Sequence, residues 1–266
     1  MNVQVKVDKA SGKIISRGIE WTDFTWNPVG GCFHECEWIM PDGTRAKCYA
    51  KAVALVMTNA YPNGFEHSYW RPAMLNEPLS QTTPSRIFMD SMSDLMGHWV
   101  PREQVLEVMA TCVKADWHTF QLLTKNAPNL LNFDLPRNVH AGVSAPPTFM
   151  NGKQLTPEQQ KAMVFKQLDV LQKLKERGQP VCWMSIEPLS FDIGDVFISW
   201  MDDRSRPSLP LNWAVIGAAS NGRKYFQPES WITKKLHTIL RREGVRIFHK
   251  GNLKWDPHLE EFPCPA

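Results

Sequence analysis

Short apolar runs alternate with longer stretches of helical periodicity along most of the chain. In the helical stretches apolar residues recur three or four positions apart, as an amphipathic helix requires. The clearest helix, over residues 156–177, opens with Thr156, Pro157 and Gln159, which form a capping-box pattern. The other predicted helices are residues 50–60, 101–115 and 228–243, and the predicted strands are residues 19–26, 86–90, 119–123, 138–143, 181–186, 213–217 and 245–248.

Strands that alternate with helices predict a parallel sheet with helical crossovers. We therefore predict an α/β fold, a partial or complete parallel (β/α) barrel, with an open doubly wound sheet as the main alternative. Polar residues follow nearly every predicted strand, at the end where α/β folds carry their sites. These residues are Asp90, Ser91, Thr124, Lys125, Ser144, Glu187, Asn221, His249 and Lys250.

Length and composition limit the class of protein. The 266 residues suit one large domain, and 43% apolar with 21% charged residues is ordinary for a globular protein. We divide the chain into an N-terminal extension (1–18), a barrel domain (19–250) and a C-terminal tail (251–266). Residues 1–13 are polar, unlike a signal peptide, and no long apolar run predicts a membrane span. A cytoplasmic protein is expected, and the net charge of +3 permits a nucleic-acid partner without arguing for one.

Three cysteines, Cys32, Cys36 and Cys48, lie within seventeen residues. Three thiolates on one loop can hold an iron–sulfur cluster and leave one iron without a protein ligand. That open iron would be a place for chemistry. The remaining cysteines look structural, because they lie on a helix face, in a strand and in a Pro-rich tail: Cys112, Cys182 and Cys264.

Other interpretations of the three cysteines remain open. His34 lies between Cys32 and Cys36 and could complete a structural zinc site, although zinc sites more often contain C-x2-C pairs. In that case the chain would be a zinc-stapled nucleic-acid-binding module without turnover. The cysteines could also be unligated and buried. A disulfide framework is the weaker interpretation in a reducing compartment.

Several short motifs lie near the three cysteines: Ile19-Glu20-Trp21-Thr22-Asp23, Trp26-Asn27-Pro28, Gly31-Cys32 and Cys48-Tyr49-Ala50. Together with later stretches at 90–95, 121–125, 142–144 and 185–189, they resemble a known family, the phage-associated three-cysteine radical-SAM-like proteins. That family is similar to radical S-adenosylmethionine enzymes such as spore photoproduct lyase. The likeness covers roughly residues 19 to 250.

The resemblance implies a partial (β/α) barrel, a 4Fe–4S cluster held by Cys32, Cys36 and Cys48, and S-adenosylmethionine bound at the open iron. Reductive cleavage of that cofactor would give a 5′-deoxyadenosyl radical, which abstracts hydrogen from a substrate. The expected substrate is a nucleotide or a nucleic-acid base, in DNA modification or repair. The expected partner is a reductant of the flavodoxin or ferredoxin type.

The cysteine spacing departs from the common radical-enzyme pattern C-x3-C-x2-C. Cys32 and Cys36 keep the first interval, but eleven residues separate Cys36 from Cys48. This stretch includes the turn at residues 41–43. We therefore expect residues 37–47 to fold back and bring Cys48 to the cluster.

The resemblance also suggests residues that hold the cofactor. Asp90, Ser91 and Ser93 would bind the amino group of S-adenosylmethionine, unless Ser93 or Asp94 caps a helix instead. Ser144 and Glu187 would hold the ribose hydroxyls or the methionyl ammonium, although Ser144 could be an ordinary loop hydroxyl. Gly217 would allow close approach of the adenine, or would only relieve crowding.

Lys125, Glu187 and Lys250 are the candidate catalytic residues. Glu187 needs a partner if buried, and either lysine could supply one as a structural pair. The basic and amide groups of Lys125, Asn221, Arg223 and Lys250 could meet an anionic substrate such as a nucleotide phosphate, or could be solvated surface. A second basic group on the helix at 228–243 is a solvated face or a nucleic-acid rim: Lys234, Lys235, Arg241 and Arg242.

Overall fold

The computed structural model describes all residues except 8–10, 12–13, 204–207, 223 and 264–266. Two residues named from the sequence, Arg223 and Cys264, therefore lie outside the described residues. The chain divides into two compact units. Unit 1 comprises Met1–Phe33, Tyr49–Ala141 and Pro265–Ala266, and unit 2 comprises His34–Cys48 and Gly142–Cys264. The predicted boundaries at residues 18 and 250 stay a prediction.

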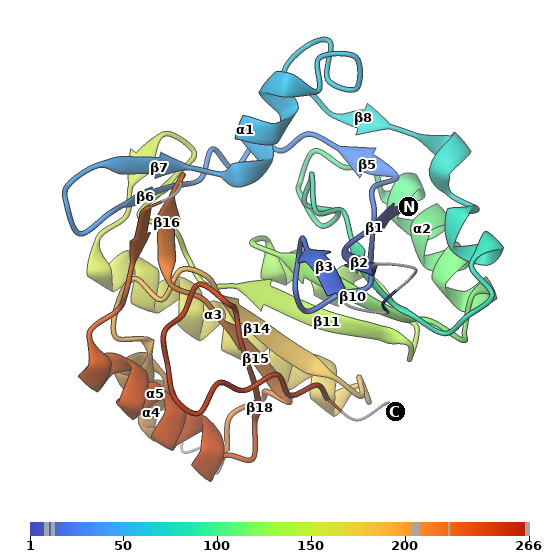
Figure 1. Ribbon diagram of the computed structural model, residues 1–266. Helices are drawn as coiled ribbons and strands as arrows, with labels where there is room; N and C mark the ends of the chain where they lie inside the picture. Colours follow the sequence, from blue (N-terminus) through green and yellow to red (C-terminus); the bar gives the residue numbers. More distant parts are fainter. Residues whose placement is uncertain (8–10, 12–13, 204–207, 223, 264–266) are drawn as a thin grey trace. The chain divides into compact units, whose positions relative to one another are not determined.

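The strands that unit 1 contributes to the eight-stranded sheet are mostly parallel (Figure 1). β4 (Phe24–Trp26) pairs in parallel with β9 (Arg86–Met89), and β9 pairs in parallel with β10 (Thr119–Thr124). β1 (Asn2–Val3) runs antiparallel to β4. The carboxyl ends of β4, β9 and β10 therefore point the same way.

In unit 2, β14 (Cys182–Ile186), β15 (Trp213–Ile216) and β18 (Arg246–His249) are parallel neighbours. β11 (Val139–Ser144) belongs to both units, and the strand order is β1-β4-β9-β10-β11-β14-β15-β18. The fold is thus mixed α/β, with a large and mostly parallel sheet of eight strands, as the alternation of strands and helices predicted.

The helices form where the apolar spacing predicted them. In unit 1, α2 (Arg102–Lys114) forms within the predicted range 101–115 and buries Val105, Val108, Met109 and Cys112 on one face. In unit 2, α3 (Pro157–Glu176) has the full capping box: Thr156 accepts from the Gln159 backbone, and the Gln159 side chain accepts from the Thr156 backbone. The helix α5 (Ser230–Arg242) matches the prediction at 228–243.

Other elements differ from the prediction. α1 (Tyr49–Val56) ends four residues before the predicted end, and only β4 forms within the strand-like stretch at 19–26. The helix α4 (Ile193–Asp203) was not predicted; it buries one face and packs against α3 and α5. The remaining elements of unit 1 are β2 (Val5–Val7), β3 (Ile14–Arg17), β5 (Val29–Gly30), β8 (Tyr69–Trp70) and the 3-10 turns Pro72–Met74, Glu77–Ser80 and Ala127–Asn132.

Unit 2 also carries a second, smaller sheet. The hairpin β6 (Glu37–Ile39) and β7 (Arg45–Lys47) extends through β12 (Phe149–Met150) to β13 (Lys153–Gln154). β16 (Ala219–Asn221) and β17 (Lys224–Phe226) form a separate hairpin. A cluster of Met40, Ala46 and Ala219, flanked by Trp38 and Phe226, joins these pieces.

Membrane insertion through a helix is not indicated. Within the described ranges, the helices are too short or too polar to cross a bilayer.

Candidate functional site

The backbone that leads into Cys32 is fixed in unit 1 by several partners. β5 pairs antiparallel with β8, which places Gly30 opposite Tyr69. The Gly31 N–H then donates to the Met92 carbonyl at 3.0 Å, and the Cys32 N–H donates to the Phe65 carbonyl at 2.9 Å. The position of the first cysteine is therefore set by the backbone and does not depend on a metal.

Gly31 is required at its position. Its φ is +80°, and a Cβ there would lie 1.8 Å from the His67 carbonyl oxygen and 2.9 Å from that of Phe65. Both obstacles are backbone atoms, which cannot swing aside as a long side chain can. Only glycine fits where the chain turns into the cysteine loop.

The polar residues after β9 also hold this segment. Asp90 Oδ1 accepts a hydrogen bond from the Val29 N–H at 3.0 Å, and Ser93 Oγ donates to the Gly31 carbonyl at 2.7 Å. Both side chains therefore bind the backbone that precedes Cys32. Their predicted contact with the amino group of S-adenosylmethionine stays a prediction.

Ser91 and Asp94 have similar supporting roles. Ser91 Oγ donates to Asn27 Oδ1 at 3.1 Å, directly after β4. Asp94 accepts from the Met96 N–H at 3.1 Å and from the Lys125 N–H at 2.9 Å. Asp94 thus closes a local turn and fixes the residue that follows β10. Lys125 is held at the carboxyl end of its strand, as predicted.

Asp90 is the most deeply buried of these carboxyl groups. It is 3% exposed, and its φ of +52° is uncommon for a residue with a side chain. Burial raises the pKa of Asp90 well above its usual range, and the nearby Asp94 adds to the rise. The hydrogen bond from Val29 and the charge of Arg71 oppose this rise.

Cys36 and Cys48 are neighbours in unit 2. The eleven residues between them form the β6–β7 hairpin, in which Glu37 pairs with Lys47. One step further along the ladder, the Cys48 N–H donates to the Cys36 carbonyl at 3.1 Å. The prediction that residues 37–47 fold back is confirmed. The long interval in sequence becomes a short one in space.

The donor set suits a soft metal centre. Cys36 is buried, Cys32 and Cys48 are half-buried, and in the described part of the chain none of the three is in a disulfide. Within that same part, no three His, Cys, Asp or Glu side chains are grouped as a metal site would require. Thiolates are the ligands that iron–sulfur clusters prefer, and metal binding itself draws such ligands together.

His34, the alternative zinc ligand, also lies in unit 2. It is buried, and its carbonyl accepts from the Asn151 N–H at 2.7 Å. Its backbone is thus tied to the loop after β12. Of the residues described, His34, Cys36 and Cys48 do not form a group that could hold a metal ion.

A second polar cluster of unit 2 lies at the carboxyl ends of β14, β15 and β18. Lys250 Nζ is 3.1 Å from Glu187 Oε1, an ion pair without hydrogen-bond alignment. Ser185 Oγ donates to Glu187 Oε2 at 3.2 Å. A Cβ on Gly217 would lie 3.0 Å from Glu187 Oε1 and 3.3 Å from Lys250 Cδ, so glycine leaves room for the pair. Lys250 is therefore the partner that the sequence required for Glu187.

Ser144 lies at the end of β11. It is buried, and its carbonyl accepts from Gln167 Nε2 at 2.8 Å. The next residue, Ala145, donates its N–H to the Ser185 carbonyl at 2.8 Å, which brings the end of β11 to that of β14. Ser144 thus belongs to the same edge of unit 2 as Glu187.

A histidine pair next to Lys250 was not predicted. His237 Nε2 and His249 Nε2 are 2.6 Å apart, and His249 Nδ1 accepts from the Leu259 N–H at 3.0 Å. His249 must therefore carry its proton on Nε2 and donate it to His237. Burial, followed by the charges of His237, His258 and Arg241, lowers the pKa of His249 to about 3. Only the position of His249 after a strand could be predicted from the sequence.

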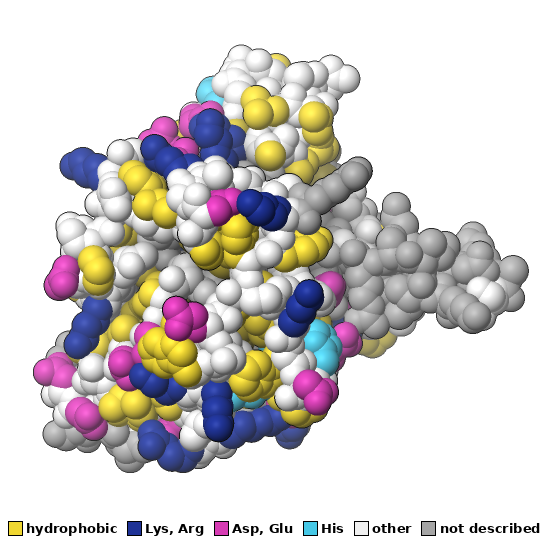
Figure 2. Space-filling model, turned by 60° about the vertical axis from the view of Figure 1, so that its left-hand side comes forward, with side chains coloured by type: hydrophobic (Ala, Val, Ile, Leu, Met, Phe, Trp, Pro, Cys, Tyr) yellow, Lys and Arg dark blue, Asp and Glu magenta, His cyan; other side chains and the backbone are white. Residues whose placement is uncertain are grey.

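The basic residues of α5 are mostly paired with carboxylates. Lys235 Nζ lies 2.6 Å from Asp192 and 2.8 Å from Asp195, and Arg241 binds both oxygens of Glu261. Figure 2 shows a face on which basic and acidic side chains are interspersed. This arrangement agrees with a solvated face of mixed charge.

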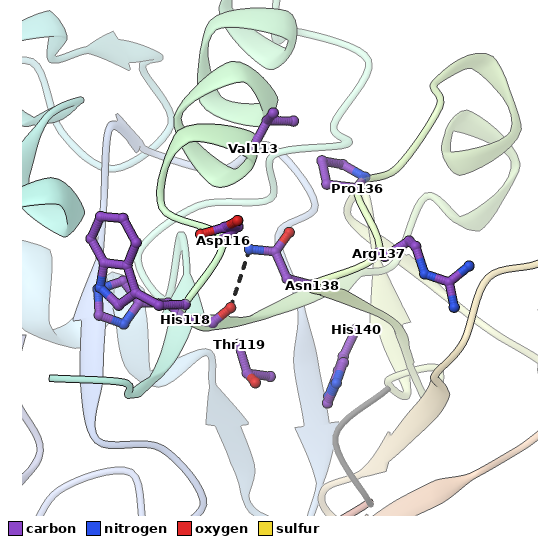
Figure 3. Close-up of a pocket in the computed structure, with 9 residues that line it drawn as sticks. Val113, Asp116, His118, Thr119, Pro136, Arg137, Asn138 and His140 are labelled. Atoms are coloured by element: carbon purple, nitrogen blue, oxygen red, sulfur yellow. Dashed lines mark hydrogen bonds between the residues drawn. The ribbon is translucent and has the colours of Figure 1, made fainter. Parts of the chain in front are cut away.

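A pocket of about 530 Å³ lies in unit 1 at the amino ends of β10 and β11 (Figure 3). Asn138 Nδ2 donates to the His118 carbonyl at 3.1 Å, and burial lowers the pKa of His140 to about 4. The sequence analysis named none of the lining residues, which come from the other end of these strands than Lys125. They are Val113, Asp116, Trp117, His118, Thr119, Pro136, Arg137, Asn138 and His140.

Comparison with known families gives a match over residues 16–261, nearly the whole chain. The chain belongs to DUF5131, a family of proteins of unknown function. No curated protein matches. The phage association of the predicted family is not tested by these comparisons.

Solved structures of spore photoproduct lyase have a similar fold. The complex with dinucleoside spore photoproduct has a TM-score of 0.51 at 9% identity, covering 93% of this chain and 80% of that one. A cysteine-to-serine mutant of that enzyme has a TM-score of 0.51 at 8% identity, covering 94% and 80%. At this identity, the likeness establishes the fold of this DUF5131 chain and leaves its activity open.

Proposed function

We propose that this DUF5131 protein holds a 4Fe–4S cluster on Cys32, Cys36 and Cys48 and acts as a radical S-adenosylmethionine enzyme on a nucleotide or nucleic-acid base. The observation that carries the proposal is the hydrogen bond between the Cys48 N–H and the Cys36 carbonyl. It brings the third cysteine beside the second despite the long interval between them. The similarity of fold to spore photoproduct lyase supports the same class.

The donor chemistry fits the cluster. Three thiolates satisfy three irons and leave the fourth for an exogenous ligand. When bound, the cluster and S-adenosylmethionine would together supply one-electron chemistry that ends in hydrogen abstraction. The protein's own part is to hold the cysteines, place the cofactor and exclude water.

Residues of both units would contribute to binding the cofactor and the substrate. Glu187 and Lys250 present opposite charges at the ends of β14 and β18. They are proposed to anchor polar groups of the cofactor or substrate and to hold or move a proton at Glu187 Oε1 or Lys250 Nζ. Lys125, at the end of β10, is proposed to meet the anionic part of the substrate.

The other predicted contacts with the cofactor are also part of the proposal. Ser144 and Gly217 lie on the same edge of unit 2 as Glu187 and are proposed to receive the sugar and the base of S-adenosylmethionine. Asp90, Ser91 and Ser93 bind backbone and side-chain groups near Cys32. A contact between these three residues and the cofactor remains part of the proposal.

A nucleotide substrate is supported by one comparison. The similar spore photoproduct lyase is complexed with a dinucleoside. DNA modification or repair is therefore the proposed setting, and a flavodoxin- or ferredoxin-type protein is the proposed reductant. We find no observation that favours the zinc alternative.

Metal analysis after anaerobic purification tests the proposal. We expect about four irons and four sulfides per chain, with their loss in Cys32→Ala, Cys36→Ala and Cys48→Ala. Cys112→Ala and Cys182→Ala are matched controls, because both thiols are buried in α2 and β14, and they should retain iron. A colourless wild-type protein with one zinc per chain would overturn the proposal.

Cofactor cleavage is tested separately. With S-adenosylmethionine and dithionite, the iron-loaded protein should form 5′-deoxyadenosine, and Glu187→Gln should reduce this formation more than Glu176→Gln, a change on exposed surface of α3. Iron binding without any 5′-deoxyadenosine would limit the proposal to cluster binding.

A further inference from the structure

The pocket of unit 1 lies at the opposite end of its strands from the predicted site residues. It opens where β10 and β11 begin, whereas Lys125 follows the last residue of β10 (Figure 3). Parallel α/β folds carry their catalytic groups at the carboxyl ends of the strands. The volume of about 530 Å³ is that of a small-molecule site. A ligand bound here would therefore be independent of the proposed radical chemistry.

Hydrogen bonds fix two side chains of the pocket wall. Asn138 Nδ2 donates to the Cys112 carbonyl at 3.0 Å and to the His118 carbonyl at 3.1 Å. Trp117 Nε1 donates to the Gln81 carbonyl at 2.9 Å. These bonds join the end of α2 to the amino ends of the two strands, so the wall is formed before any ligand arrives.

Several polar groups of the lining are available to a ligand. Within the part of the chain that the structure describes, no hydrogen bond or ion pair occupies the Asp116 carboxylate, the Arg137 guanidinium or the Thr119 hydroxyl. Asn138 Oδ1 is also unoccupied there, and Figure 3 shows it turned away from His118 while the amide nitrogen faces that residue. A fixed acceptor and two unpaired charges therefore line one cavity.

The two charges have opposite signs and lie on either side of Asn138. Figure 3 shows Asp116 on the side of α2 and Arg137 on the other side of the amide. His140 adds no charge at neutral pH, because burial lowers its pKa to about 4. The pocket thus offers acceptors for a cationic donor at one end and a guanidinium for an anion at the other.

Apolar side chains complete the lining. Val113 and Trp117 are 61% and 37% exposed, and Pro136 is half-buried. A ligand with an apolar part beside its charged groups would remove this surface from water, which favours binding.

We propose that this pocket binds a free α-amino acid with an apolar side chain, whose ammonium is held by Asp116 and Asn138 and whose carboxylate is held by Arg137. A guanidinium binds a carboxylate through two parallel N–H bonds, and an ammonium donates to carboxylate and amide oxygens. A purely anionic ligand such as inorganic phosphate would be repelled by Asp116, and a purely cationic one by Arg137. A zwitterion satisfies both.

Isothermal titration calorimetry of the full chain with L-phenylalanine and L-leucine tests the proposal. Wild type should bind at least one of them saturably below about 10 mM. Asp116→Asn and Arg137→Met should each weaken binding about tenfold, the effect of losing one charge-assisted hydrogen bond. Asp134→Asn and Lys114→Met remove exposed charges of unit 1 outside the pocket and should bind like wild type. No saturable binding of either amino acid, or wild-type affinity in either pocket variant, overturns the proposal.

Two derivatives of the bound amino acid separate its charged ends. The N-acetyl derivative lacks the ammonium, so it should bind undetectably or with an affinity that Asp116→Asn does not change. The carboxamide derivative lacks the carboxylate, so it should bind undetectably or with an affinity that Arg137→Met does not change. Derivatives that respond to both variants as the parent amino acid does would contradict the assigned roles.

A steric variant checks the location of the ligand. Val113→Trp adds bulk at an exposed position of α2 that lines the pocket, so it should abolish binding and leave the urea midpoint without ligand unchanged. Leu106→Trp is the matched control, because Leu106 is 47% exposed on the same helix outside the pocket. The amino acid should raise the urea midpoint of wild type and Leu106→Trp but not that of Val113→Trp. Wild-type binding by Val113→Trp would overturn the proposal.

Discussion

The two units use the polar residues after their strands in different ways. In unit 1, Asp90 and Ser93 hydrogen-bond to the backbone of the segment that enters the cysteine loop. In unit 2, Glu187 binds the side chains of Lys250 and Ser185. The same sequence pattern, a polar residue after an apolar strand, therefore fixes a loop in one unit and presents charged groups in the other.

This difference indicates which polar residues support a loop and which are available to bind a ligand. A side chain whose polar atoms are occupied by backbone groups cannot exchange them for a ligand without loosening the loop. A side chain paired with another side chain can change partner, because both can reorient. The unit 2 edge is the better candidate for binding, and the unit 1 edge is the better candidate for holding the first cysteine in place.

The largest expected effect comes from the rigid segment of unit 1. Gly31→Ala should lower the free energy of unfolding by about 3 kcal/mol or more, because its methyl group would collide with backbone carbonyls. Gly64→Ala is the matched control: its φ is +84° and the nearest atom to its Cβ is 3.9 Å away, so it should cost about 1 kcal/mol.

Urea denaturation monitored by tryptophan fluorescence measures both glycine variants, and iron content shows whether the loop still holds the first cysteine. Equal losses of stability in Gly31→Ala and Gly64→Ala would mean that the segment before Cys32 is less rigid than the hydrogen bonds indicate.

The next effect concerns the histidine pair of unit 2. His249 has a folded-state pKa of about 3 against 6.5 for the ordinary side chain. Its contribution to stability is therefore present above pH 6.5 and is lost as pH falls from 6.5 toward 3, by about 2 kcal/mol after a discount for solvent screening.

Asp90, in unit 1, makes stability fall rather than rise with increasing pH, because its folded-state pKa is raised. His249→Asn should flatten the rise of the urea midpoint with pH between 3 and 6.5, whereas Asp90→Asn should make that rise steeper, because it removes the opposing slope of Asp90. A His249→Asn profile parallel to that of wild type would argue against the histidine hydrogen bond.

A smaller effect is expected for the hydroxyl groups of unit 1. Ser93→Ala should cost about 1 kcal/mol, since it leaves the Gly31 carbonyl without its partner at 2.7 Å. Ser91→Ala removes a longer bond, 3.1 Å, to another side chain and should cost less. Thermal unfolding ranks the two variants, and the reverse order would contradict the backbone-holding role.

The smallest effect is the coupling between Glu187 and Lys250. Their side chains are 20% and 30% exposed, so a double-mutant cycle with Glu187→Gln and Lys250→Met should give a coupling of about 0.5–1 kcal/mol in stability. Cofactor binding, measured by calorimetry, should suffer more than stability does. A large stability coupling with unchanged binding would make the pair structural.

Much of the fold follows from sequence periodicity, but some elements do not. The cap at Thr156 and the apolar face of α2 were visible because each follows a simple local rule. α4 was missed although its buried residues Ile193, Val196 and Trp200 recur three or four positions apart, as in an amphipathic helix. The hairpin between Cys36 and Cys48 was expected only as a return of the chain, since its strands have three residues each.

The candidate site could also be predicted only in part from the sequence. Asp90, Glu187 and Lys250 could be found from their place after a strand. Whether each bonds to backbone or to side chains depends on loop conformation, such as the positive φ of Asp90.

The hairpin also changes what counts as the signature of this family. Cross-strand pairing, rather than the count of intervening residues, sets the separation between the backbones of Cys36 and Cys48. Paired additions at the hairpin tip would lengthen the interval and leave the thiols adjacent. Relatives with much longer or shorter intervals can therefore preserve the same ligand geometry, and a search based on a fixed spacing would overlook them.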